Sequence, residues 1–231
     1  MLRTDQLAQV DRRPPVVETP LGTVEFSVVL GSEELSAGPD TSWRLANGSH
    51  LHRWRHRCAT VDLLLGRVSL PPWDGEVPVH TWAAVWQVQG HGGLSGLSVS
   101  AELTTAPADA YAGPDSGECL AAVSAENDEY MVSIGGPDYE LLEAQAAHGR
   151  LVPARWADLL PRDGELTAEY GVRYADPARI TWKLPGLATA EMARLCIATA
   201  WCDRDDDRPA AWFAVDLPVD TAYQHLIADP A

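Results

Sequence analysis

Short runs of alternating or apolar residues, each bounded by Gly, Pro or Asp, recur along the chain and most constrain its fold. A half-buried strand buries every second residue, and turns need residues that tolerate unusual backbone angles, so this rhythm predicts many short β-strands. The expected strands are residues 23–30, 59–70, 80–89, 97–104, 130–134, 166–174, 179–184 and 211–217. Their regular spacing is typical of a β-sandwich or a jelly roll, so the fold class is mainly β.

Helical signals are few. The stretch YELLEAQAAH (139–148) follows Asp138 and precedes Gly149, which are start and stop signals for a short helix. A second short helix is expected from Asp220, as its N-cap, through TAYQHLIA. Residues 187–202 fit either a helix or a strand, and the alternation in their second half favours a turn followed by a strand.

The segment APADAYAGPDSG (106–117) is small, rich in Pro and Gly and without periodicity, which is typical of a linker or a long loop. It separates a β half at 18–105 from a second β half with short helices at 118–231, and residues 1–17 are expected to be a flexible segment. The alternative is one integrated domain, since 231 residues can form a single large β-domain.

Three faint echoes link the halves, one of them between Arg67-Val68-Ser69 and Arg179-Ile180-Thr181. TVEFSV (23–28) is similar to TAEYGV (167–172), and the hairpin predicted at 84–103 has a counterpart at 199–217. If these echoes reflect a duplication, the two halves are related β-sheets packed face to face. Chance similarity between strands is the alternative, because the echoes lack the fixed period of a repeat protein.

Composition narrows the function classes. With 17 Lys and Arg against 33 Asp and Glu, the formal net charge is -16, which disfavours nucleic-acid binding and favours a basic protein partner. No apolar run is long enough to span a membrane, the N-terminus lacks a secretion signal, and four scattered cysteines make no disulfide framework, so we expect a cytoplasmic protein. Abundant Arg and Ala with a single Lys indicate a GC-rich, actinobacterial-type genome.

The stretch NGSHLHRWRHRCAT (47–60) concentrates three His and three Arg in this acidic chain. Asn47-Gly48 between two alternating runs predicts a hairpin with a two-residue turn, in which Arg44 pairs with Leu51 and Trp43 with His52. One face then carries Trp43, Leu45, His50, His52, Trp54, His56 and Cys58, and the other carries Arg44, Leu51, Arg53, Arg55 and Arg57. We expect the His and Trp face to point inward and the arginines to form an exposed ridge.

The histidines have two interpretations. They can pack in the core beside the tryptophans, or His50, His52 and His56 can hold a Zn, Fe or Mn ion with a further ligand. GSHLHRWRH resembles the first motif of the cupins, which are jelly-roll β-barrels, and PPWDGEVPVH, ending at His80, is loosely similar to their second motif. The chain departs from the first motif because no Glu follows His52 at the expected interval.

Two charged surfaces are candidate partner-binding sites. The first is Arg53, Arg55 and Arg57, which can contact an anionic group of a partner or pair with this protein's own carboxylates. The second is the acidic stretch at Asp203, Asp205, Asp206 and Asp207, whose spacing matches only the start of a calcium loop, so a solvated hairpin tip is the simpler interpretation.

No nucleophile elbow, P-loop or zinc-protease motif occurs in the sequence. The leading hypothesis is therefore a non-enzymatic acidic interaction factor of the immunity, inhibitor or accessory type, without a cofactor, that binds a basic protein. The alternatives are a metal-dependent, cupin-like enzyme that uses His50, His52 and His56, and a cytoplasmic carbohydrate-binding β-sandwich, since nine Trp offer stacking surfaces.

Overall fold

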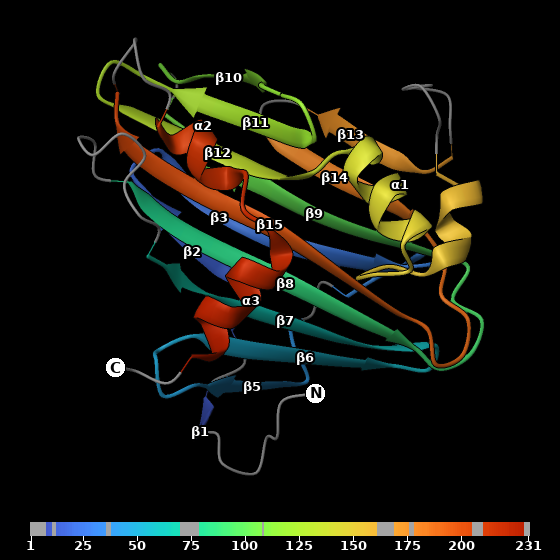
Figure 1. Cartoon of the computed structure of the whole chain (residues 1–231). Coiled ribbons are helices and arrows are strands. Elements are labelled where there is room, and N and C mark those ends of the chain that lie inside the picture. The colour runs from blue at the N-terminus through green and yellow to red at the C-terminus, as the bar shows by residue number, and fades with distance from the viewer. Residues whose placement is uncertain are drawn as a thin grey trace.

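Two antiparallel sheets packed face to face form the body of the molecule (Figure 1) in a computed structural model of the chain. The structure describes residues 8–10, 13–35, 38–69, 79–107, 109–160, 169–175, 178–204 and 210–228. The expectation of a mainly β, sandwich-like fold is confirmed.

Among the described residues, the larger sheet, here called the large sheet, has nine strands. In spatial order they are β1 (Ala8–Val10), β5 (Thr41–Arg44), β6 (His50–His56), β7 (Ala59–Val68), β8 (His80–Gly90), β15 (Met192–Asp203), β12 (Tyr130–Pro137), β11 (Leu120–Glu126) and β10 (Tyr111–Pro114). The small sheet contains β13 (Gly171–Ala175), β14 (Arg179–Pro185), β9 (Gly96–Thr104), β3 (Gly22–Leu30) and β2 (Val16–Thr19), with β4 (Glu33–Glu34) beside β3.

Both sheets mix strands from the two sides of residues 106–117. β15 lies between β8 and β12 in the large sheet, and β14 lies beside β9 in the small sheet. The segment expected to be a linker contains β10, which pairs with β11. Residues 1–17, expected to be flexible, contain β1, paired with β5, and the first residues of β2.

The main core fills the space between the sheets. Val61, Leu63 and Leu65 of β7 point into it, while Leu64 and Val68 of the same strand lie under a helix on the outer face. The run of three leucines in this strand therefore reflects burial on both faces rather than a break in the alternation. Trp86 is fully buried against Trp54, at 5.9 Å between ring centroids.

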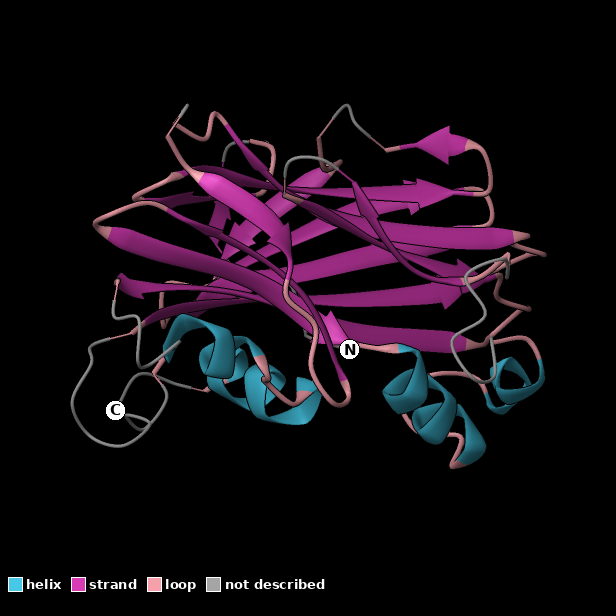
Figure 2. Ribbon diagram, turned by 90° about the horizontal axis from the view of Figure 1, so that it is seen from above, coloured by secondary structure: helices cyan, strands magenta, loops and turns pink. Residues whose placement is uncertain are grey.

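Within the part of the chain that the structure describes, three α-helices and a short 3-10 helix lie on one side of the strands (Figure 2). α1 (Tyr139–Ala147) matches the sequence prediction, and the Asp138 carboxylate accepts a hydrogen bond from Leu141 N–H at 2.8 Å as its N-cap. α3 (Val219–Ile227) is also where expected, although its N-cap is Pro218, and Asp220 lies in the first turn. The 3-10 helix, η2, spans Ala154–Asp158.

The strand predicted at 211–217 is wrong, because α2 (Ala210–Val215) is a helix. Its alternation suggested a period of two, but Phe213 is exposed, whereas Ala211 and Val215, one helical turn apart, are buried against the large sheet. Gly135 of β12 leaves room for this contact, since a Cβ there would lie 2.8 Å from Val215 Cγ2. The strand predicted after 187 is confirmed as β15, whereas residues 166–168 of another predicted strand lie outside the described residues.

The 84–103 segment is not a hairpin within one sheet, because β8 belongs to the large sheet and β9 to the small sheet. The glycine-rich loop between them therefore crosses from one layer to the other. Close packing explains glycine at its start, since a Cβ on Gly90 would lie 2.3 Å from Ala188 O. Its proposed counterpart at 199–217 is a strand followed by a helix, so this echo has no structural equivalent.

Candidate functional site

The histidine- and arginine-rich hairpin forms β5 and β6, but its turn differs from the prediction. Leu45 N–H donates to Ser49 O at 2.8 Å and Gly48 N–H donates to Leu45 O at 3.0 Å, which closes a loop of three residues with Gly48 at φ +87°. The register therefore shifts by one residue, and Arg44 pairs with His50, Trp43 with Leu51 and Ser42 with His52. Such a shift moves every side chain of one strand to the other face, so the predicted face is wrong for Trp43, which lies with Leu51 and Arg53 rather than with His50 and His52.

The reason for the longer loop lies in the side chain of Asn47. Its Nδ2 donates to three carbonyl oxygens at the end of α3, with distances of 3.4 Å to His225, 2.9 Å to Leu226 and 3.0 Å to Ala228. Its Oδ1 accepts from Ser49 N–H at 3.0 Å. The turn thus caps the C-terminal end of α3, where His225 is 178 positions after Asn47 in the sequence.

Of the three candidate metal ligands, His50 and His52 lie together, whereas His56 contacts a different element. His52 is buried and its Nδ1 lies 3.0 Å from Ser42 Oγ, while His50 stacks on it at 6.0 Å between centroids. His56 Nε2 lies 3.1 Å from Glu33 Oε2 of β4. Within the described part of the chain, no group of three or more His, Cys, Asp and Glu side chains is placed to hold a metal ion.

Burial lowers the pKa of His52 to about 4, with a smaller contribution from His50. Burial, followed by the nearby Arg44 charge, also lowers the pKa of His50. Both rings therefore favour the neutral form, as expected of imidazoles that pack beside an inter-sheet core.

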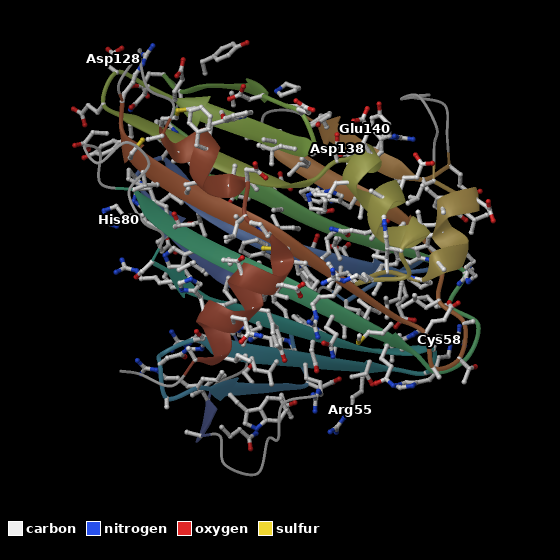
Figure 3. The ribbon with its side chains drawn as sticks, viewed as in Figure 1. Arg55, Cys58, His80, Asp128, Asp138 and Glu140 are labelled. Carbon is white, nitrogen blue, oxygen red and sulfur yellow. The ribbon has the colours of Figure 1, made fainter. Side chains whose placement is uncertain are left out.

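The predicted arginine ridge is wrong at Arg53. This side chain is buried and makes two hydrogen bonds to Asp62 of β7, from Nε to Oδ1 at 2.6 Å and from Nη2 to Oδ2 at 2.7 Å. Its guanidinium also lies 5.5 Å from the Trp43 ring centroid. Arg55 and Arg57 are exposed as predicted, and Arg55 projects away from the sheets (Figure 3).

The predicted acidic stretch at Asp203, Asp205, Asp206 and Asp207 is only partly described. Asp203 is exposed at the end of β15, whereas Asp205, Asp206 and Asp207 lie outside the described residues. Beside Asp203, Arg204 N–H donates to Glu129 O at 2.9 Å, and its guanidinium lies 3.6 Å from Glu126 and 3.9 Å from Asp128. We call Glu126, Asp128, Glu129 and Asp203 the acidic tip.

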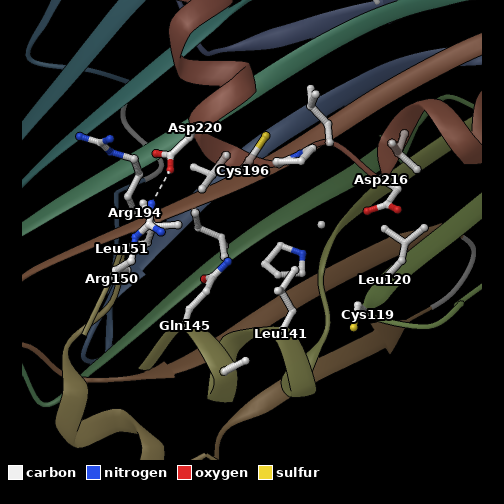
Figure 4. Close-up of a pocket in the computed structure, with 18 of the residues that line it drawn as sticks. Cys119, Leu120, Leu141, Gln145, Arg150, Leu151, Arg194, Cys196, Asp216 and Asp220 are labelled. Atoms are coloured by element: carbon white, nitrogen blue, oxygen red, sulfur yellow. Dashed lines mark hydrogen bonds and ion pairs between the residues drawn. The ribbon is translucent and has the colours of Figure 1, made fainter. Parts of the chain in front are cut away.

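A pocket that the sequence did not predict opens on the outer face of the large sheet (Figure 4). It has a volume of about 450 Å³, within the range of small-ligand sites. β12 and β15 form its floor, α1 forms one wall, and the segment joining α2 to α3 forms the other. Its apolar lining includes Leu120, Pro137, Leu141, Ala144, Leu151, Leu195, Cys196, Val215, Leu217, Pro218 and Val219.

The two ends of the pocket differ in charge. At one end, Cys119 is exposed near the carboxylates of Glu118, Asp138, Glu140 and Asp216, which we call the acidic end. Figure 3 shows Asp138 and Glu140 together at the start of α1, and Figure 4 shows Asp216 beside the pocket on the same side as Cys119. At the other end, Arg150 Nη2 lies 3.4 Å from Asp220 Oδ2, with both side chains exposed.

The thiols of this pocket are poor nucleophiles. Desolvation, then the charges of the acidic end, raise the pKa of the Cys119 thiol. Full burial raises the pKa of Cys196 to about 12. Because the thiolate is the reactive form, neither side chain is activated.

Arg194 lines the pocket with its aliphatic stem. Its guanidinium is directed away, stacking at 4.3 Å from the Tyr223 ring centroid, and Nη2 donates to Gln87 at 2.8 Å (Figure 4). The pocket is therefore mainly apolar, and the charged side chains of Arg150, Asp216 and Asp220 in its lining are exposed.

Sequence reasoning missed this pocket because its lining comes from segments between residues 119 and 220 that no motif connects. The signal available was the pair of helices predicted at 139–148 and from Asp220, whose spacing on the sheet depends on tertiary packing. The tryptophans, considered for sugar stacking, are buried or half-buried wherever the structure describes them, and Trp73 lies outside the described residues.

None of the helices in the described residues is long and apolar enough to cross a membrane. No family model matches the sequence, and no curated protein matches it. A solved structure titled a putative kojibiose phosphorylase from human microbiome is similar with a TM-score of 0.46 and 8% sequence identity. The match covers 87% of this chain, which spans 24% of that enzyme's chain.

Proposed function

We propose that this protein is a non-enzymatic interaction factor, of the immunity, inhibitor or accessory type, that binds a basic protein partner. The observation that carries this proposal is the apolar pocket with four carboxylates at one end. An exposed apolar depression with a charged rim is a common form of protein-binding site, in which the apolar part contributes affinity and the charges contribute partner choice.

Two features of the pocket favour binding over catalysis. Its two cysteines have raised thiol pKa values, so they are not prepared as nucleophiles. The Asp138 carboxylate is held as the N-cap of α1, where it accepts from a backbone N–H. Desolvation, with a smaller contribution from Glu140, raises its pKa, so a nearby positive charge would stabilise its ionised form.

The charge balance indicates the sign of the partner. Even if each of the 17 Lys and Arg paired with one of the 33 Asp and Glu, 16 carboxylates would have no cationic side chain to pair with. Such an excess attracts positively charged proteins over distances of about 10 Å at moderate salt and speeds their association.

Fluorescence anisotropy can test this function with two pools of labelled, blocked peptides of equal length. Both pools contain the same apolar residues, and one adds Lys and Arg where the other adds Asp and Glu. We expect the intact protein to bind only the basic pool, and the affinity to fall as NaCl is raised. Equal binding of both pools, or binding that is insensitive to salt, would contradict the proposal.

A further inference from the structure

We infer that the pocket receives a short extended segment of the partner, in which an apolar side chain rests on the floor and a neighbouring Lys or Arg reaches the acidic end. This inference rests on the proposed function and adds where the partner binds and in which direction its segment lies. It follows from the shape of the pocket, the chemistry of its floor and the unequal charges of its two ends.

The floor is suited to an apolar side chain. Cys196 of β15, Leu141 of α1 and Val215 of α2 come from different elements and line one depression between α1 and the α2–α3 segment. Water in such an apolar depression makes few hydrogen bonds, so its replacement by a Leu, Met or Phe side chain is favourable. A volume of about 450 Å³ accommodates this side chain together with the adjoining backbone.

The acidic end determines which neighbour the apolar side chain has. Asp216 lines the pocket, while Glu118, Asp138 and Glu140 lie near enough to Cys119 to disfavour its thiolate. Carboxylates gathered in this way repel one another, and a cationic side chain among them relieves this repulsion. A Lys or Arg beside the inserted apolar residue provides this charge.

The opposite end gives the segment its direction. Arg150 and Asp220 already form an ion pair between the loop after α1 and the first turn of α3, so this end has no excess of negative charge. The acidic tip is likewise a poorer cation site, because Arg204 lies among its carboxylates. The cation of the segment therefore belongs beside Cys119 rather than at Arg150 or at the tip.

Protection of Cys119 reports occupancy of the pocket in the full-length protein. Iodoacetamide alkylates exposed thiols, and mass spectrometry follows the Cys119 peptide separately from the one containing Cys58. Three blocked peptides of equal length serve as probes: one with Leu-Lys, one with Ser-Lys and one with Leu-Glu at its centre. We expect the Leu-Lys peptide to slow alkylation of Cys119, while the other two peptides leave the rate unchanged.

Matched variants locate the effect. Ala144 is an exposed pocket residue of α1, and Ala144→Trp should fill the pocket and abolish protection, whereas Ala147→Trp on the same helix should preserve it. Asp216→Asn should weaken binding of the Leu-Lys peptide about two- to fivefold, the range for exposed charge pairs. Asp109→Asn removes the same charge from a surface loop and should leave binding unchanged.

Each contrary result has a distinct meaning. Equal protection by the Ser-Lys peptide, or protection that survives Ala144→Trp, overturns the pocket inference. If the basic pool binds in anisotropy but no probe protects Cys119, the inference fails and the proposed function stands. Loss of binding in Asp203→Lys, with Asp216→Asn unchanged, would move the site to the acidic tip. If no basic peptide binds, both proposals fail.

Discussion

The β5–β6 hairpin and the pocket between α1 and the α2–α3 segment differ in how well their local sequence indicates a functional site. The hairpin has the most unusual local sequence, yet its Arg53, His52 and Asn47 side chains are satisfied by contacts within the molecule. The pocket is lined by ordinary residues from distant segments, and its carboxylates gather around one exposed cysteine. Unusual composition at the hairpin thus reflects structural demands, whereas the candidate site depends on tertiary placement.

The largest effect is expected at the buried ion pair of the hairpin, between Arg53 and Asp62. Arg53→Met leaves the carboxylate of Asp62 without its partner in a nearly buried position, and such a loss costs about 3–5 kcal/mol of unfolding free energy. Urea denaturation measures the change. The double variant Arg53→Met/Asp62→Leu should recover much of the loss, because no buried charge then remains. If the unfolding free energy of the single variant fell by less than about 0.5 kcal/mol, the pair would behave like an exposed one, and the difference between hairpin and pocket would not hold.

The pH dependence of stability tests the second hairpin contact. The folded-state pKa of His52, about 4, lies below its ordinary value of 6.5. The unfolded chain therefore binds the proton more tightly. The contribution of neutral His52 to the unfolding free energy is complete above pH 6.5 and is lost as the pH falls toward 4. The shift corresponds to roughly 3 kcal/mol.

His52→Gln isolates this contribution, because it removes the titrating ring and retains a polar side chain beside Ser42. Between pH 7 and pH 4, measured in urea, the unfolding free energy of the wild type should fall by more than that of the variant. A constant difference across this range would show that His52 does not titrate as its burial implies.

A smaller effect is expected at the turn. Asn47→Ala removes the donor to three carbonyl oxygens at the end of α3, which should cost about 1 kcal/mol. Asn47→Asp should cost more, because a carboxylate at a helix C-terminus is repelled by the helix dipole. Hydrogen exchange should speed up in α3 for both variants. Asn127→Ala, at another turn where Asn127 accepts from backbone N–H groups, should leave α3 unchanged.

The hairpin also shows the limit of local sequence reasoning. Period-two alternation correctly predicted most strands and the inward direction of Trp54, because burial on a strand has a fixed period. The turn length was wrong because Asn47 bonds to α3, a partner that no local rule reveals. The segment at 211–217 was misassigned for the same reason, since contacts with β12 and β15 stabilise a short helix there.

Local sequence rules could not predict the pocket. α1 and α3 were predicted from their own start signals, yet the distance between them depends on where β12 and β15 lie in the large sheet. Strand order is a long-range property, because β15 inserts between β8 and β12 after a long stretch of intervening chain. When a site is formed by segments that are distant in sequence, the sequence pattern predicts its helices but not the site itself.

The smallest predicted effect compares two ion pairs directly. Arg150 and Asp220 at the pocket rim have side-chain exposures of 75% and 54%, against 6% and 15% for Arg53 and Asp62. Exposed pairs gain little because water screens them and ordering two side chains costs entropy, so Arg150→Gln should change the unfolding free energy by less than about 0.5 kcal/mol. Arg53→Gln is the matched variant, and urea denaturation of both gives the difference. Equal losses would show that the rim pair holds the pocket walls together, and the rim would then stabilise the fold as much as the hairpin does.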